Sequence, residues 1–196
     1  MSVYIHGGLR SPIGVLNGQY KHMRPEILGS QVIDEIINRY TISHIDGIFC
    51  GNAVGTGGNL GRLMGLMCNL PNSVPAITVD MQCASALMSI EIAYAHIVSG
   101  IMDSAIAGGI ESSSLQPERV YASGDDREGP YKVAQFTPQD QSPLAMLKGA
   151  ERTIHKYNVT KEDLYPHIIG SHQRASAALD NPYLQSYIMP ITIDGK

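Results

Sequence analysis

The stretch Ala76–Gly109 constrains the fold more than any other part of the chain. It contains a short β-branched run behind Pro75, a tight junction with one cysteine, a helix-length apolar segment closed by Gly100, and a second small apolar run at Ser104–Gly108. A strand, a helix and a second strand in this order predict a βαβ unit with parallel strands. Cys83 then stands at the N-terminus of the crossover helix.

The crossover helix, expected from Ala84 to Ser99, is apolar or small-sided around its whole circumference. Glu91 is its only formally charged residue. A helix with one face in water carries a polar stripe, whereas a helix that is apolar all round is enclosed. We therefore expect this helix to lie between two layers of structure rather than on the outside of one sheet.

The chain before this unit alternates strand-like and helix-like segments, which predicts an α/β layer with a parallel sheet. The helix over residues 25–40 has an amphipathic pattern and a proline at its first position. The expected elements are a strand at Val3–Ile5, a helix from Pro25 to about Tyr40, a strand at Asp46–Cys50, and a helix over Leu60–Leu70 that Asn59 caps.

Beyond Gly109 the character of the sequence changes. Residues 111–141 are rich in serine, proline, glycine and charge, which is typical of a functional excursion or a small subdomain. Two helices should follow, and a capping-box-like pattern begins the second. Pro166 is expected to bend this second helix or to delay its start. The expected elements are helices at Ser142–Tyr157 and Thr160–Asp180 and a β-like run at Tyr187–Ile193.

Composition narrows the class of protein. The 196 residues are 43% hydrophobic and 16% charged, as in a soluble globular protein with extensive burial. The net charge of −4 gives no reason to expect nucleic acid or an anionic membrane as a partner. No apolar run reaches the length of a membrane span, and the N-terminus lacks a signal-peptide core, which favours a cytoplasmic protein. Three cysteines at no metal spacing indicate free thiols and no metal site.

Cys83 is the strongest candidate for chemistry. A thiol at a helix N-terminus lies at the positive end of the helix dipole and beside unpaired amide hydrogens, which stabilise the reactive thiolate. The same amides can hold the oxyanion that forms when a thiolate attacks a carbonyl. The alternative is a small buried core residue, the usual place of a free cysteine. Position alone leaves both interpretations open.

The other candidate groups give weaker signals. Cys50 and Cys68 are expected in the core, since they fall in a strand and on a helix among methionines. Seven histidines are present, but none adjoins Cys83 in the sequence, and His96 lies far along the same helix, so the catalytic base is not identified. The glycine-rich stretch Gly55–Gly61 lacks the lysine and spacing of a P-loop, and a close-packed connection is the commoner meaning of such glycines.

With these residues in view, the chain resembles the N-terminal half of a thiolase, the family of acetyl-CoA acetyltransferases and 3-ketoacyl-CoA thiolases. The matching pieces occur in family order and cover nearly the whole chain, and the pair QCASAL and GGIES is the most specific. The pieces are RSPIG at Arg10–Gly14, GNAVGTGGNLGR at Gly51–Arg62, VPAITVDMQCASAL at Val74–Leu87, AIAGGIESSS at Ala105–Ser114, SPLAMLKGAERT at Ser142–Thr153 and SHQRASAAL at Ser171–Leu179.

The resemblance implies that Cys83 is the nucleophile that accepts an acyl group from acetyl-CoA or from a 3-ketoacyl-CoA, and that its amide lies in an oxyanion hole. Coenzyme A would be a substrate rather than a covalently bound cofactor. Residues 1–114 would form an incomplete N-terminal thiolase-like α/β domain, and residues 115–196 part of the loop domain that covers CoA. Met146 would lie near the pantetheine, next to Ala145 where many biosynthetic members carry histidine.

The resemblance also implies what this chain lacks. The family's layered αβαβα fold consists of two similar halves, and the second half supplies a G-H-P histidine and a C-x-G cysteine that are absent here. The chain is therefore interpreted as one βαβ-type half that is inactive or weakly active alone. It would act in lipid metabolism as a homodimer or tetramer, or with a complementary C-terminal half. The alternatives are a catalytically silent CoA-binding or assembly subunit and a ketoacyl-synthase relative.

Overall fold

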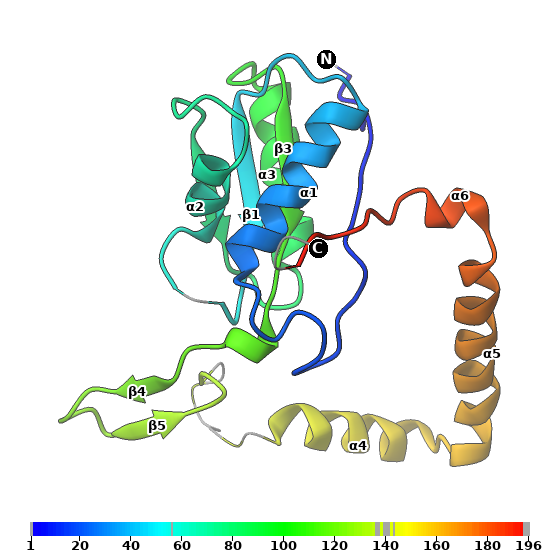
Figure 1. Cartoon of the computed structure of the whole chain (residues 1–196). Helices are drawn as coiled ribbons and strands as arrows, with labels where there is room; N and C mark the ends of the chain where they lie inside the picture. Colours follow the sequence, from blue (N-terminus) through cyan, green and yellow to red (C-terminus); the bar gives the residue numbers. More distant parts are fainter. Residues whose placement is uncertain (1, 56, 136–137, 139–141, 143, 194–196) are drawn as a thin grey trace. The chain divides into compact units, whose positions relative to one another are not determined.

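The computed structural model describes residues 2–55, 57–135, 138, 142 and 144–193. The chain divides into two compact units, drawn in sequence colours in Figure 1: Met1–Pro117 together with Ser186–Lys196, and Glu118–Gln185. The expected ranges were 1–114 and 115–196. The difference is that the C-terminal residues cluster with the first unit, where Arg10 and Ile188 form a parallel β-bridge.

The first unit contains a parallel three-stranded sheet in the order β2-β1-β3. Its strands are β1 (Gly47–Gly51), β2 (Ala76–Val79) and β3 (Ala105–Gly109). All five residues of β1 are buried, as expected for a central strand that is covered on both faces. Because the strands are parallel, their last residues share one edge of the sheet. The parallel α/β layer and the βαβ unit expected from the sequence are confirmed.

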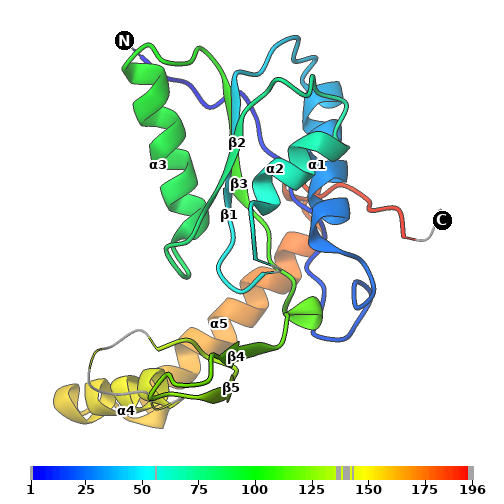
Figure 2. The same ribbon diagram turned by 90° about the vertical axis from the view of Figure 1, so that its left-hand side faces the viewer.

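Helices cover both faces of this sheet. Figure 2 shows α3 (Ser85–Val98) on one face and α1 (Pro25–Arg39) and α2 (Leu60–Met67) on the other. The Asn59 side chain caps α2 by accepting the Arg62 amide at 3.0 Å, as the sequence predicts. The hydrophobic core lies on the side of α1 and α2, and its buried members are Ile33, Ile45, Ile48, Cys50, Met64, Cys68, Val74 and Ala76.

The two ends of the chain differ from expectation. The strand predicted at Val3–Ile5 is wrong: this segment has no regular secondary structure, and Ile5 is 89% exposed. A strand needs a hydrogen-bonded neighbour, and β3 pairs only with β1 among the described residues. The β-like run at Tyr187–Ile193 forms only the single bridge to Arg10, whose amide donates to the Tyr187 carbonyl at 2.9 Å.

In its described residues, the second unit contains a short hairpin and three helices. Its elements are β4 (Arg119–Tyr121), β5 (Gly129–Tyr131), α4 (Ala145–Tyr157), α5 (Lys161–Leu179) and α6 (Pro182–Gln185). The capping box is confirmed, since the Thr160 hydroxyl accepts the Asp163 amide while the Asp163 carboxylate accepts the Thr160 amide. The box fixes the start of α5 at Lys161, so Pro166 does not delay it. Pro143, expected at the start of α4, lies outside the described residues.

Candidate functional site

Cys83 lies where β2 gives way to α3, at the edge of the sheet formed by the carboxyl ends of the strands. Its side chain is exposed, so the interpretation of Cys83 as a buried core residue is wrong. It immediately precedes Ala84, the N-cap of α3. The first amide groups of a helix have no carbonyl partner within the helix, and they concentrate positive potential at this end. The thiol therefore stands in solvent at the end of the helix that favours an anion.

The turn that carries Cys83 has an unusual backbone. Gln82 has a φ of 51°, in the left-handed region that residues other than glycine seldom adopt. The Gln82 amide donates to Asp80 Oδ1 at 2.9 Å, and the Ala84 amide donates to the Met81 carbonyl at 3.1 Å. These bonds reverse the chain within a few residues, so the cysteine projects at the point where strand becomes helix.

Two glycines seat the start of α3 directly on the sheet. Gly51 and Gly109 end β1 and β3 and are partners in the register of these strands. A Cβ atom on Gly51 would lie 2.5 Å from the Ser85 carbonyl carbon, and a Cβ atom on Gly109 would lie 2.8 Å from the Ala86 Cβ. Only glycine lets the backbone approach this closely. The position of the Cys83 turn relative to the strands is therefore set by backbone contact.

Glu111 ties together the loops that follow β1 and β3. Its carboxylate accepts the amides of Ala53 and Val54 at 3.0 and 2.8 Å and the Asn52 side-chain amide at 3.1 Å. Asn52 Nδ2 also donates to the Ile110 carbonyl at 2.8 Å. Glu111 and Asn52 lie within the GGIES and GNAVGTGGNLGR pieces, but neither was predicted to be a site residue. The available signal was their place, because each follows a parallel strand at the same edge of the sheet.

The other two cysteines are inert by comparison. Cys50 and Cys68 are buried, as predicted. Burial raises the pKa of the Cys50 thiol to about 11 and that of the Cys68 thiol to about 12. The Cys68 thiol also donates to the Met64 carbonyl at 3.0 Å. Because the thiolate is the nucleophilic form of cysteine, neither residue is a candidate nucleophile at neutral pH.

Comparison with known proteins decides the family. The family model described as "Thiolase, N-terminal domain" matches residues 3–196 of this chain. The chain belongs to the thiolase family. It is 34% identical over 193 residues to VraB of Staphylococcus aureus strain MSSA476, a protein named as an acetyl-CoA C-acetyltransferase, covering 95% of this chain and 51% of VraB. It is 32% identical over 197 residues to VraB of Staphylococcus epidermidis, covering 95% of this chain and 50% of that protein.

The fold agrees with this assignment. The structure superposes on the crystal structure of the Bacillus anthracis acetyl-CoA acetyltransferase with a TM-score of 0.81 and 26% identity, covering 98% of this chain and 51% of that one. The thiolase-like half-fold expected from the sequence is thus confirmed. The chain spans about half the length of the relatives that it matches.

Among the described residues, α3 of this thiolase half is covered on one side only. Ser85, Ser89 and Ala93 are buried against the sheet. On the opposite side, Leu87 and Tyr94 are 68% and 54% exposed. The described part of the chain supplies one covering layer, and the other side of α3 has no partner there, as the resemblance to half of a thiolase implies. The exposed side is nevertheless apolar rather than a polar stripe, and its exposed large apolar residues are Leu87, Ile90, Tyr94 and Val98.

No histidine hydrogen bonds to Cys83 within the described ranges. His96 turns its Nδ1 to the Ile92 carbonyl, at 2.9 Å, and its ring packs near Phe49 with centroids 5.1 Å apart. It is a structural histidine of α3. The base of the thiolase reaction therefore has no counterpart in the contacts around Cys83.

Met146, the residue that the thiolase resemblance places near the pantetheine, lies in the first turn of α4 in the second unit and is 73% exposed. The structure thus leaves it accessible to a ligand. Across the described residues, no group of three or more histidine, cysteine, aspartate or glutamate side chains could hold a metal ion. No helix in the same residues combines the length and apolar character needed to cross a bilayer.

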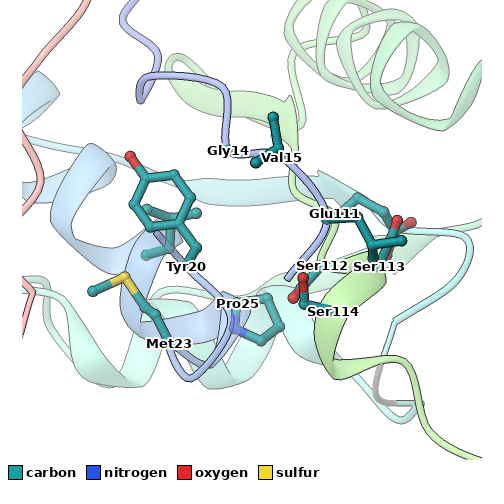
Figure 3. A pocket seen from close by; sticks show the side chains of 11 residues that line it. Gly14, Val15, Tyr20, Met23, Pro25, Glu111, Ser112, Ser113 and Ser114 are labelled. Carbon is teal, nitrogen blue, oxygen red and sulfur yellow. The ribbon is translucent and has the colours of Figure 1, made fainter. Parts of the chain in front are cut away.

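A small hollow of about 150 Å³ lies elsewhere in the first unit. Figure 3 shows Tyr20 and Met23 on one side of it and Ser112–Ser114 on the other. Cys83 is not among its lining residues. The Ser114 hydroxyl accepts the Asn17 amide at 2.8 Å, so it is committed to holding the N-terminal loop. Because ligand pockets usually measure about 300–1,000 Å³, this hollow is too small to be the acyl-CoA site.

Proposed function

We propose that this chain is the nucleophile-bearing half of a thiolase-type acyltransferase and that Cys83 accepts the acyl group. The observation that carries the proposal is the exposed Cys83 thiol on a strand-to-helix turn, in a chain whose relatives are named acetyl-CoA acetyltransferases. The two other thiols are buried and protonated, so Cys83 is the one cysteine suited to attack.

The chemistry follows from the position of the thiol. The Cys83 thiolate attacks the thioester carbonyl of an acyl-CoA, and the carbonyl oxygen becomes an oxyanion beside the amides at the start of α3. Collapse of this intermediate breaks the bond to the CoA sulfur, which leaves as a thiolate and is protonated. The acyl group, now a thioester on Cys83, passes either to the carbanion of a second acyl-CoA or back to free CoA. Met146, in the second unit, contacts the pantetheine arm of the bound CoA.

A complementary thiolase half completes the site. It covers the apolar face of α3 formed by Leu87, Ile90, Tyr94 and Val98, since an apolar patch of this kind seldom stays in water. It also supplies the base that the contacts around Cys83 do not include. The half-chain by itself therefore forms the acyl-cysteine slowly and turns over poorly. A second copy of this chain is the alternative cover, and it would give a homodimer or a tetramer.

A second candidate function is that of a catalytically silent CoA-binding or assembly subunit. This function is favoured because no histidine hydrogen bonds to Cys83 in the described part of the chain. The match to the thiolase N-terminal domain favours either thiolase function over a ketoacyl-synthase relative. The two remaining candidates differ in one observable, which is whether Cys83 becomes acylated.

Intact-protein mass spectrometry after incubation with acetyl-CoA separates these functions. The nucleophile proposal predicts the added mass of one acetyl group on the chain and on a Cys68→Ser control, and none on Cys83→Ser. Acetoacetyl-CoA thiolysis, measured in parallel, should be weak or absent. An unchanged mass of the wild-type chain would support the silent subunit. Vigorous thiolysis by the 196-residue chain would show that no second half is needed.

A further inference from the structure

The Ser85 side chain closes the turn on which Cys83 stands. Ser85 is the first residue of α3, and only 5% of it is exposed. Its hydroxyl donates to the Gln82 carbonyl at 2.6 Å and accepts the Met81 amide at 2.8 Å. The Ser85 amide donates to the same Gln82 carbonyl at 3.1 Å. Ser85, the first residue of α3, is thus hydrogen-bonded to both Met81 and Gln82, the two residues that precede Cys83.

This link acts on the residue whose backbone is least favourable. Gln82 keeps its φ of 51° without the freedom of a glycine. A conformation of this kind persists only where surrounding contacts impose it, and such residues cluster at functional sites. The Gln82 carbonyl accepts bonds from both the Ser85 hydroxyl and the Ser85 amide, so loss of the hydroxyl removes the shorter of the two bonds and also leaves the Met81 amide without its acceptor.

We infer that Ser85 is a positioning residue for Cys83: its hydroxyl holds Gln82 in the left-handed conformation and so aims the Cys83 thiol along the start of α3. The inference rests on the proposed function, in which this thiol attacks a thioester. Ser85 does not touch the reacting atoms. It fixes the thiol relative to the α3 amides, which stabilise the thiolate and the oxyanion only when they are aligned with them.

Ser89 offers a matched comparison one turn further along α3. It is fully buried, and its single hydroxyl proton is shared between the Ala86 carbonyl at 2.7 Å and the Gly108 carbonyl at 2.8 Å. Removal of either hydroxyl therefore removes buried hydrogen bonding from the first two turns of α3. Of these two hydroxyls, only that of Ser85 bonds to the Cys83 turn. A general loss of stability should therefore affect Cys83 alike in both serine variants, whereas a loss of positioning should affect it only when Ser85 is changed.

The test compares Ser85→Ala, Ser89→Ala and the double variant Gln82→Gly/Ser85→Ala in the full chain. Two rates are measured for Cys83: alkylation by iodoacetamide, which needs no CoA site, and acetylation by acetyl-CoA. We expect Ser85→Ala to lower the acetylation rate by at least about tenfold, since misplacement of a group that reacts with a bound substrate is costly. Alkylation should slow in the same direction, since the thiol moves away from the positive end of α3. Ser89→Ala should stay within about twofold of wild type. The glycine variant should recover most of the loss, because glycine takes a positive φ without penalty.

Equal rates for Ser85→Ala and Ser89→Ala would overturn the inference, and so would a double variant as slow as Ser85→Ala. If Ser85→Ala does not fold, Gln82→Val and Gln82→Gly give the same test: valine should slow alkylation and glycine should not. Failure of the proposed function is seen separately. If acetyl-CoA labels no variant while the alkylation pattern holds, Ser85 positions Cys83 but the thiolase half-reaction does not occur. If acetyl-CoA labels wild type and Ser85→Ala alike, the half-reaction stands and the positioning role fails.

Discussion

Gly51→Ala should move the start of α3 and with it the proposed nucleophile. The new Cβ would lie 2.5 Å from the Ser85 carbonyl carbon, whereas ordinary contact begins at 3.4 Å. Because the obstacle is backbone at the beginning of a helix, no side chain can rotate away, and the helix start must withdraw by about 1 Å to restore contact. Overpacking of this kind destabilises a fold by about 1–3 kcal/mol.

The same shift should cost more in reactivity than in stability. A displacement of about 1 Å at a reacting group lowers a rate by about a hundredfold. We therefore expect acetylation of Cys83 to fall by about that factor in Gly51→Ala, with the unfolding free energy from urea titration lower by about 1–3 kcal/mol.

Gly108→Ala is the matched control, since a Cβ atom there meets nothing within 4 Å. It should keep both the stability and the acetylation rate of the wild type. A Gly51→Ala chain as reactive as Gly108→Ala would refute the argument that the glycine contact positions the Cys83 turn.

Three further predictions concern other parts of the structure. Native thiol titration should label Cys83 rapidly, whereas Cys50 and Cys68 should react only in denaturant; rapid reaction of all three would contradict their burial. Ile90→Lys, on the exposed face of α3, should change the unfolding free energy by less than about 0.5 kcal/mol. The same variant should weaken self-association in sedimentation, and unchanged self-association would show that this face is not an interface. Backbone amides and a histidine lower the pKa of Asp46 from 3.8 to about 2, so its stabilising contribution is present above pH 3.8 and is lost as the pH falls towards 2. Urea titrations over this range should therefore show a weaker loss of stability in Asp46→Asn than in wild type.

The parts of the fold that the sequence predicted are those set by local pattern. The βαβ unit follows from β-branched runs on either side of a long apolar helix, and the Asn59 and Thr160 caps follow from short-range hydrogen bonding. Both kinds of signal lie within a few residues of the element that they define. The location of Cys83 between β2 and α3 was readable for the same reason.

The parts that were not predicted depend on neighbours distant in the sequence. Val3–Ile5 has the composition of a strand, but a strand also needs a hydrogen-bonded neighbour, and local composition does not reveal whether the chain brings one alongside. The α3 pattern correctly indicated two apolar sides, yet the described chain covers one of them. The bonds from the loop after β1 to Glu111 join residues almost sixty positions apart, which no local pattern reveals.

The central claim is that the Cys83 sulfur carries the acyl group as a thioester. Peptide mapping by mass spectrometry, after incubation with isotopically labelled acetyl-CoA and an acid quench, tests it most directly. The account predicts the label on the peptide that contains Cys83, its removal by neutral hydroxylamine, and its absence from Cys83→Ser. Label on a lysine or on another cysteine, or label that survives in Cys83→Ser, would contradict it.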